Sequence, residues 1–193
     1  MKRLVGILLL LGVALTQSGS VTQYHAVVAR KKASAVLILI AEEDGGSANQ
    51  FGSSTDEWMS GDFDAPSTTT VRVVSLKMEY VNADGADNVT VGIYTNNGSD
   101  EPGTLVGSED TQDPALTASQ EWYDFTVNAP ISSGTSYVIV AKVADGGLAS
   151  FRRIKVGMAS VFTAGYNVKE SGDLGTSWNT TGSGKKISYR LYE

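Results

Sequence analysis

The feature that most constrains the fold of this chain is a strand, turn and strand pattern over residues 89–108. Val89, Val91 and Ile93 alternate with polar, small or aromatic residues, and a period of two is typical of a strand with one buried face. An Asn-Asn-Gly sequence and a Pro-Gly pair follow, and these residue types favour a reversal of the chain. The segment therefore predicts a hairpin whose second strand begins at Leu105.

The same alternation recurs along the rest of the chain. It is seen at residues 70–81 and 121–127, between stretches rich in Gly, Asn and Asp. The run at 136–143 is apolar on both parities, which favours a central strand covered on both faces. Roughly nine such runs at intervals of about ten residues, with no helical stripe, predict an all-β fold, an antiparallel two-sheet β-sandwich of jelly-roll type.

Composition narrows the classes of function. With 41% hydrophobic and 19% charged residues, a chain of 193 residues can bury the core of one domain. It contains no cysteine, which excludes disulfides, thiol nucleophiles and thiolate metal sites. Its net charge of −6 argues against nucleic acid or an anionic membrane surface as the main partner.

The chain divides into three parts. Residues 1–20 have a basic start, a short apolar run and a small polar exit, which is the pattern of a secretory signal peptide. The run has about a dozen residues and a bilayer span needs about 20, so the alternative is an apolar arm used in an assembly. Residues 21–55 contain a β-branched run at 35–41, expected to be a buried strand, and a linker. Residues 56–193 form the predicted sandwich domain, which is expected to fold alone.

Two pairs of motifs and one single motif resemble a known family. They are Ile93-Tyr94-Thr95 with the sequence PGTLVGS at 102–108, then WYDFTV at 122–127 with APISSGTSYVIV at 129–140, and finally SGDLGTSW at 171–178. This chain resembles, over about residues 56–193, the choice-of-anchor R type of β-sandwich domain found in bacterial surface proteins and phage-related proteins. The resemblance implies a sandwich fold and an extracellular, cell-surface or virion location. It implies no particular ligand and no reaction.

Residues 171–178 also resemble an Asp-box, S-x-D-x-G-x-T-W, with Ser177 in place of Thr. In such a turn the carboxylate of Asp173 accepts backbone N–H groups, Gly175 takes a conformation barred to other residues, and Trp178 packs under the hairpin. These residues account for a structural turn. One copy is no evidence of glycosidase activity.

The inventory of reactive side chains predicts that the protein is not an enzyme. The single histidine, His25, precedes the predicted sandwich, so histidine-dependent nucleophilic schemes are excluded within that domain. Paired carboxylates remain as a possible acid and base, but none of the 21 acidic residues stands in a distinctive pattern. A glycan-processing enzyme is therefore the least favoured hypothesis.

One loop contains candidate ligands for a metal ion. Asp84 and Asp87, with Asn82 and Asn88 beside them, supply oxygen ligands of the kind that Ca²⁺ prefers. The spacing lacks the regular D-x-D-x-D-G series, and the same residue types build ordinary turns. No other cofactor is predicted.

Two aromatic residues are candidates for ligand binding. Tyr94 and Trp122 fall on the parity opposite the apolar faces of their strands. An exposed ring on a sheet can stack on a sugar ring, because both offer a flat apolar surface with polar edges. Alternatively, either ring lies under a loop or within the second sheet.

These observations lead to two functional hypotheses. The first is a non-enzymatic extracellular module for adhesion or surface recognition, directed at glycans. The second is a structural or decoration protein of a virion or extracellular filament, whose partners are protein subunits, including copies of itself, and which uses its amino-terminal segment for assembly. An exposed groove lined by aromatic residues favours the first, and an ordered amino-terminal arm favours the second.

Overall fold

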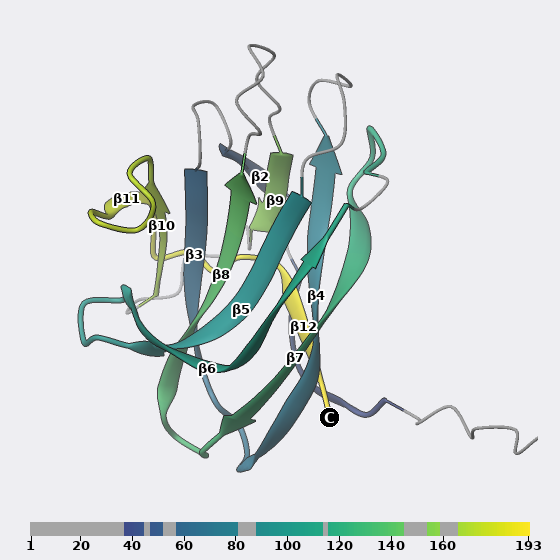
Figure 1. Ribbon diagram of the computed structural model, residues 1–193, viewed down its shortest axis with the longest axis vertical. Helices are drawn as coiled ribbons and strands as arrows, with labels where there is room; N and C mark the ends of the chain where they lie inside the picture. Colours follow the sequence, from purple (N-terminus) through teal and green to yellow (C-terminus); the bar gives the residue numbers. More distant parts are fainter. Residues whose placement is uncertain are drawn as a thin grey trace, which may run out of the picture. The chain divides into compact units, whose positions relative to one another are not determined.

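The computed structural model describes residues 37–44, 47–51, 57–80, 88–113, 116–144, 154–158 and 166–193. These residues form twelve β-strands and no helix, and the strands make two antiparallel sheets that pack face to face (Figure 1). The predicted all-β sandwich is therefore confirmed.

Sheet A is built around the longest strand, β4. Its six strands are β1 (Leu39–Glu43), β12 (Tyr189–Tyr192), β4 (Thr69–Tyr80), β9 (Ile154–Met158), β2 (Ser47–Phe51) and β7 (Glu121–Ile131). Leu76 of β4 pairs with Tyr123 on one side and with Tyr189 on the other, so β7 and β12 lie on opposite edges of β4. Strand β9 then pairs with the end of β4 beyond β12.

Sheet B contains the hairpin predicted at 89–108 and the central strand predicted at 136–143. Its order is β11 (Asn179–Ser183), β10 (Asn167–Ser171), β3 (Glu57–Asp64), β8 (Ser136–Ala144), β5 (Asn88–Asn96) and β6 (Pro102–Gln112). The β5–β6 hairpin is confirmed, although β6 begins at Pro102, three residues before the predicted start. Strand β8 pairs with β3 and β5, which confirms it as a central strand.

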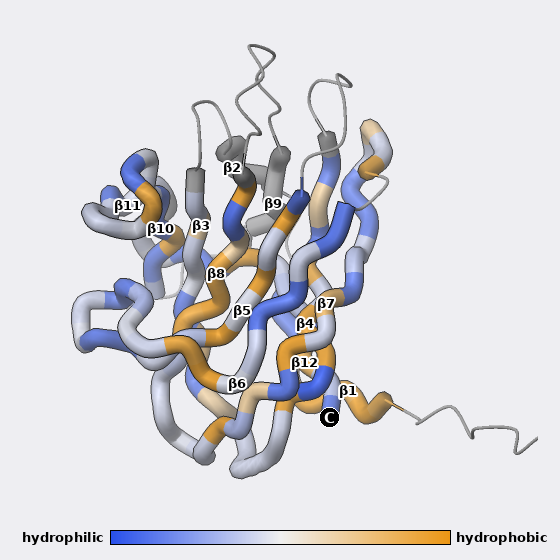
Figure 2. The backbone as a smooth tube through the Cα atoms, in the orientation of Figure 1, coloured by the Kyte–Doolittle hydropathy of each residue, from blue (hydrophilic) through white to orange (hydrophobic). Residues whose placement is uncertain are grey.

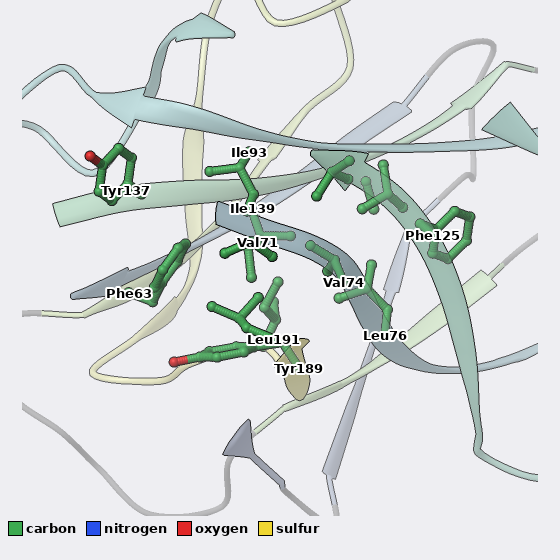
Figure 3. Close-up of a cluster of buried hydrophobic side chains, with 14 of the residues drawn as sticks. Phe63, Val71, Val74, Leu76, Ile93, Phe125, Tyr137, Ile139, Tyr189 and Leu191 are labelled. Carbon is green, nitrogen blue, oxygen red and sulfur yellow. The ribbon is translucent and has the colours of Figure 1, made fainter. Parts of the chain in front are cut away.

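The core lies between the sheets, where alternate residues of facing strands meet (Figure 3). Strand β5 contributes the predicted set of Val89, Val91 and Ile93, all fully buried. Phe63 of β3 lies between two tyrosines, with its ring centroid 5.9 Å from that of Tyr137 and 5.6 Å from that of Tyr189. The apolar faces predicted from the period of two therefore lie together in the core.

The compact unit begins before the predicted domain boundary. It covers Val36–Glu193, and both β1 and β2 come from the segment 21–55 that was expected to precede the sandwich. The run at 35–41 was predicted to form a buried strand, but it leads into an edge strand beside β12 (Figure 2), where Ile38 is 56% exposed. The predicted signal peptide, residues 1–20, lies outside the described residues. No described segment is a helix long and apolar enough to cross a bilayer.

Strands β6 and β7 close one side of the sandwich (Figure 1), although they belong to different sheets. Ser108 Oγ donates to Val127 O at 2.8 Å, and Asp110 Oδ2 accepts from Thr126 N at 2.8 Å. At Gly107, whose φ is 78°, an added Cβ would lie 2.4 Å from a backbone oxygen of β7, so only glycine permits this approach. Side chains thus satisfy backbone groups that an open sheet edge would leave to pair with another chain.

Candidate functional site

The outer face of sheet B, which points away from sheet A, is covered rather than open. Ser60 of β3 and Val138 and Val140 of β8 point outward, yet all three are fully buried. Two connections lie over this face: the loop formed by residues 96–101 between β5 and β6, and the hairpin turn formed by residues 171–178 between β10 and β11 (Figure 1).

The 96–101 loop is held in shape by its own asparagines. Asn96 Oδ1 accepts from the amides of Gly98 at 2.8 Å and Asp100 at 3.1 Å, and Asn97 Oδ1 binds the two amides one residue further along. Such bonds from an Asn side chain to the amides that follow it stabilise a turn without help from the rest of the fold. The sequence therefore determines the shape of this loop locally.

The far side of the loop is anchored to β10, across β8 and β3. Asn167 Nδ2 donates to Asp100 Oδ2 at 2.7 Å. Lys169, which is buried, donates to the carbonyl oxygen of Ser99 and lies 3.1 Å from Glu101 Oε1. These contacts span the outer face and cover its centre.

An open pocket of about 540 Å³ lies where this loop meets β3, β8 and Tyr166. We call it the acidic pocket. Its polar lining includes Asp62, Asp64, Asn96, Asp100, Ser136 and Tyr166. Among the described residues that line it, none is a lysine, an arginine or an aliphatic residue larger than glycine.

Asp62 is the most buried carboxyl group of the acidic pocket, with 2% of its surface exposed. Its Oδ1 accepts from the backbone N–H of Asn167 at 2.9 Å. The backbone N–H of Asp62 itself also donates to this carboxylate. Burial, with a smaller contribution from the charge of Asp100, raises the pKa of Asp62 to about 6.

The other two carboxylates of the acidic pocket have neutral partners. Asp64 accepts from the hydroxyl of Tyr166 at 2.7 Å, and this bond raises the pKa of Tyr166 to about 12. Asp100 accepts from two amides, that of Asn167 and, at 3.2 Å, that of Asn96. Lys186 Nζ lies 3.9 Å from the centroid of the Tyr166 ring and 3.6 Å from Glu43 Oε2. Negative charge is therefore concentrated in the pocket.

Tyr94, one of the two predicted ligand-binding residues, lies on the same face, where Tyr94 and Asp62 pair with opposite sides of Val138. The parity prediction is correct, since the ring points away from the core, but only 9% of the residue is accessible, as in the alternative in which other residues cover the ring. The Tyr94 hydroxyl accepts from Lys142 Nζ at 2.6 Å and donates to Glu109. Burial, and then the Glu109 carboxylate, raise its pKa. The ring offers no open face for stacking.

The ammonium of Lys142 occupies the space that a ligand would need beside Tyr94. It lies 4.3 Å from the centroid of the Trp58 ring and 5.1 Å from that of Tyr94, and it contacts the Glu109 carboxylate. Cation–π contact and an ion pair together satisfy this charge. The cluster of Lys142, Tyr94, Trp58 and Glu109 therefore packs on the outer face of sheet B through contacts within the protein.

The 171–178 hairpin turn has the chemistry that its motif indicates. Asp173 Oδ1 accepts from the backbone N–H of Ser177 at 2.9 Å and from the hydroxyl of Ser171 at 2.7 Å. Oδ2 accepts from the hydroxyl of Ser177 at 2.6 Å, so hydroxyl groups provide most of the donors. These bonds, those from Ser177 foremost, lower the pKa of Asp173 to about 2.

The same turn places one tryptophan against another. The Trp178 ring centroid lies 6.3 Å from that of Trp58, and its Nε1 donates to Gly175 O at 3.2 Å. Gly175 has φ of 82°, and an added Cβ would lie 2.6 Å from the Trp58 ring. Glycine is thus required here both for its conformation and for its size.

Trp122, the other predicted ligand-binding residue, lies on the outer face of sheet A and is half-buried. The Arg190 guanidinium carbon lies 4.0 Å from the centroid of its ring, and Lys77 Nζ lies 5.8 Å from it. Arg190 also donates to Glu42 of β1 at 2.8 Å. Trp122 is therefore a partly accessible ring on a polar sheet surface.

Comparison with known proteins adds no relative. Neither a protein family model nor a curated protein sequence matches this chain. The resemblance to the choice-of-anchor R domain stays an expectation, and inferences about function rest on the geometry.

Sequence reasoning missed the acidic pocket and favoured a loop that the structure does not describe. The predicted metal ligands Asp84 and Asp87 lie outside the described residues, as does His25. A signal for the pocket was present, because Asp62 and Asp64 alternate with Phe63 and must share the face opposite to the core. What periodicity could not indicate is that the 96–101 loop and Tyr166 meet them there.

Proposed function

We propose that this protein is a non-enzymatic extracellular module that recognises glycans at a surface. The observation that carries the proposal is the acidic pocket, an open concave site of about 540 Å³ whose lining residues all have polar side chains except Gly98. Pockets of several hundred Å³ suit small organic ligands. Carboxylates, amides and hydroxyls converging on one site offer the acceptors and donors that a polyhydroxylated ligand requires.

The acidic pocket is also rigid in its construction. The Asn96 side chain sets the shape of the loop, and Asn167 fixes Asp100 from the neighbouring strand. A site whose groups are held in place before binding loses less conformational entropy when the ligand arrives. This favours a recognition role for the pocket over a purely structural one.

Trp122 provides a second surface for the same function. A half-buried indole on a flat sheet, flanked by Arg190 and Lys77, can place its accessible part against a sugar ring while the cations bind hydroxyl groups. It lies on sheet A, whereas the acidic pocket lies on sheet B. The two surfaces can be tested separately.

Glycan processing is the alternative that the pocket raises. Asp62, with its raised pKa, has one property of a general acid. Hydrolysis also needs a second carboxylate on the opposite side of the scissile bond, and Asp64 and Asp100 are both engaged by hydrogen bonds to Tyr166 and asparagine. Binding requires no such pair, and we therefore propose recognition without catalysis.

The test is binding of the full chain to a panel of immobilised surface oligosaccharides. We expect binding that Asp64→Asn weakens about tenfold, because a charged acceptor contributes more than a neutral one. Asp113→Asn is the matched control, since it removes the same charge at an exposed position outside the pocket. Failure of the folded protein to bind any oligosaccharide would contradict the proposal, and release of shorter products would favour the enzyme.

A separate observation favours the structural hypothesis as a second candidate. Strand β1 ends sheet A, and among the described strands none pairs with its outer edge. Leu37, Ile38 and Leu39 beside that edge are 40%, 56% and 46% exposed. An apolar edge of this kind is suited to pairing with the same strand of a second copy.

Sedimentation velocity tests this second candidate. We expect a concentration-dependent dimer of the full chain that Ile38→Lys converts to a monomer, because a charge on an edge opposes pairing between sheets. Glu79→Lys, on β4 away from this edge, is the control for an added positive charge. A monomer at all concentrations would argue against assembly through β1.

A further inference from the structure

We infer that Lys169 and Asn97 become joined by an isopeptide bond between the Nζ atom of the lysine and the side-chain carbonyl carbon of the asparagine. The Glu101 carboxylate lies between the two side chains and contacts both. The inference concerns the loop that covers sheet B and does not depend on what the acidic pocket binds. Its basis is the placement of an amine, an amide with a polarised carbonyl and an acid that touches both.

Glu101 brings the two reacting side chains together. Its Oε1 lies 3.1 Å from Lys169 Nζ, and its Oε2 accepts from Asn97 Nδ2 at 3.1 Å. One carboxylate therefore holds the amine beside the amide, although Lys169 and Glu101 are 68 positions apart. Among the ion pairs of the described residues, this is the one whose carboxylate also binds an asparagine side chain.

Lys169 is held in place as a nucleophile. Only 8% of the residue is exposed, and its Nζ also donates to the carbonyl oxygen of Ser99. Hydrogen bonds from Asn97 and then from Lys169 lower the pKa of Glu101, so the carboxylate is ionised at neutral pH and can accept a proton from the amine. A carboxylate is a weak base, and we therefore expect the bond to form slowly.

The side-chain carbonyl of Asn97 is polarised by two backbone donors. Its Oδ1 accepts from the amide of Ser99 at 2.8 Å and from that of Glu101 at 3.3 Å. Attack at Cγ places negative charge on this oxygen, and fixed N–H donors stabilise such charge as in an oxyanion hole. Attack by the backbone nitrogen of Gly98, which would give a cyclic imide, is opposed because this N–H donates to Asn96 Oδ1 at 2.8 Å.

The reaction balances without an oxidant or a cofactor. Lys169 gives a proton to Glu101, and the neutral Nζ attacks Asn97 Cγ. The Cγ–Nζ bond forms, Glu101 passes its proton to Nδ2, and the Cγ–Nδ2 bond breaks with release of ammonia. Ammonia takes up the extra proton of the attacking nitrogen, so the positive charge of Lys169 leaves as ammonium. The product ties the 96–101 loop to β10 and closes a long loop of chain, as a disulfide can.

Mass spectrometry of the full chain tests the inference, with fresh protein compared with protein aged for a month. We expect the mass to fall by that of one ammonia molecule. Digestion with trypsin should release a linked pair of peptides, one with Asn97 and one that is uncut after Lys169. Glu101→Gln should abolish the link, as should Lys169→Arg, which keeps the charge. Lys186→Arg, which alters the ion pair with Glu43, is the control and should retain the link.

The possible results separate three reactions of Asn97. Loss of ammonia without linked peptides would mean that Gly98 has closed a cyclic imide, and it would overturn the inference. An unchanged mass after ageing, or conversion of Asn97 to an acid, would also overturn it. A link that forms equally well in Glu101→Gln would overturn the role given to that carboxylate. If Lys169→Arg does not fold, Asn97→Ala, at an exposed position, repeats the test.

Discussion

Asn167 Nδ2 donates to Asp100 Oδ2 at 2.7 Å, which joins the first residue of β10 to the loop between β5 and β6. The two residues are 67 positions apart, and β8 and β3 lie between their strands. This bond holds the loop across the outer face of sheet B. It also fixes Asp100, which is one of the carboxylates of the acidic pocket. The same bond therefore covers the sheet face and helps to build the pocket.

We expect Asn167→Ala to release the 96–101 loop while keeping the sandwich. The side-chain bond is lost, but the backbone N–H that binds Asp62 remains, so the free energy of unfolding should fall by about 1 kcal/mol. Amide hydrogen exchange should be faster in the loop and unchanged in β8. Asn179→Ala, at an exposed position of β11, is the control. Unchanged exchange in the loop would show that its own asparagines suffice.

Asp62 should make stability depend on pH in an unusual direction. Its pKa is raised from 3.8 to about 6 in the folded protein, so between these values the folded chain keeps a proton that the unfolded chain has lost. The free energy of unfolding therefore falls as pH rises through this window. At neutral pH, Asp62→Asn should stabilise the protein by about 1 to 2 kcal/mol, and below about pH 4 it should have little effect.

Urea denaturation of both proteins at a series of pH values measures this difference directly. The comparison with Asp62→Asn is needed because other carboxylates also titrate, and Asp64→Asn serves as a control on the same strand. A difference that grows toward acid pH would have the wrong sign and would mean that the Asp62 carboxylate is stabilised by its surroundings.

Asp173 should act in the opposite direction to Asp62. Hydrogen bonds lower its pKa to about 2 from 3.8, so its contribution is present above about pH 4 and is lost as pH falls through this range. Asp173→Ala should lower the thermal midpoint at neutral pH and have less effect near pH 2. Binding of glycan in the acidic pocket should remain, because the residue lies in the other connection over the sheet. Loss of binding with normal stability would make the hairpin turn a functional site.

Two of the three half-buried tryptophans, Trp122 and Trp178, should separate stability from recognition. Trp178→Ala removes the ring that packs on Trp58 and should cost about 2 kcal/mol, less than a fully buried tryptophan. Trp122→Ala loses mainly cation–π contact with Arg190 and should cost about 1 kcal/mol. If the face of sheet A binds glycan, Trp122→Ala also weakens binding, as measured by calorimetry. A stability loss at Trp122 larger than that at Trp178 would assign this ring a structural role.

The position of the domain boundary can be tested by truncation. Residues 36–193 should melt cooperatively in circular dichroism, whereas residues 56–193 lack β1 and β2 and should be less stable or aggregate. The shorter chain leaves β12 and β9 with unpaired edges, since β1 and β2 are their neighbours. Equal stability of the two chains would support the boundary at residue 56 that the sequence predicts.

The local features of this protein were determined by the sequence. Alternation at Val89, Val91 and Ile93 placed β5 and its inner face, and the apolar run at 136–143 indicated the central strand β8. The turn residues indicated the β5–β6 hairpin and the turn at Asp173. These features depend on backbone preferences and on the period of a strand, and both act within a few residues.

Only the tertiary structure decided what covers each face. Parity placed Tyr94 outside the core, but Lys142, Glu109 and the neighbouring tryptophan bury it. The acidic pocket joins Asp62 to Tyr166 across more than a hundred residues of sequence, as the bond from Asn167 to Asp62 illustrates with a separation of 105. The period of a strand specifies the direction of a side chain, whereas its exposure depends on which distant loop lies over it.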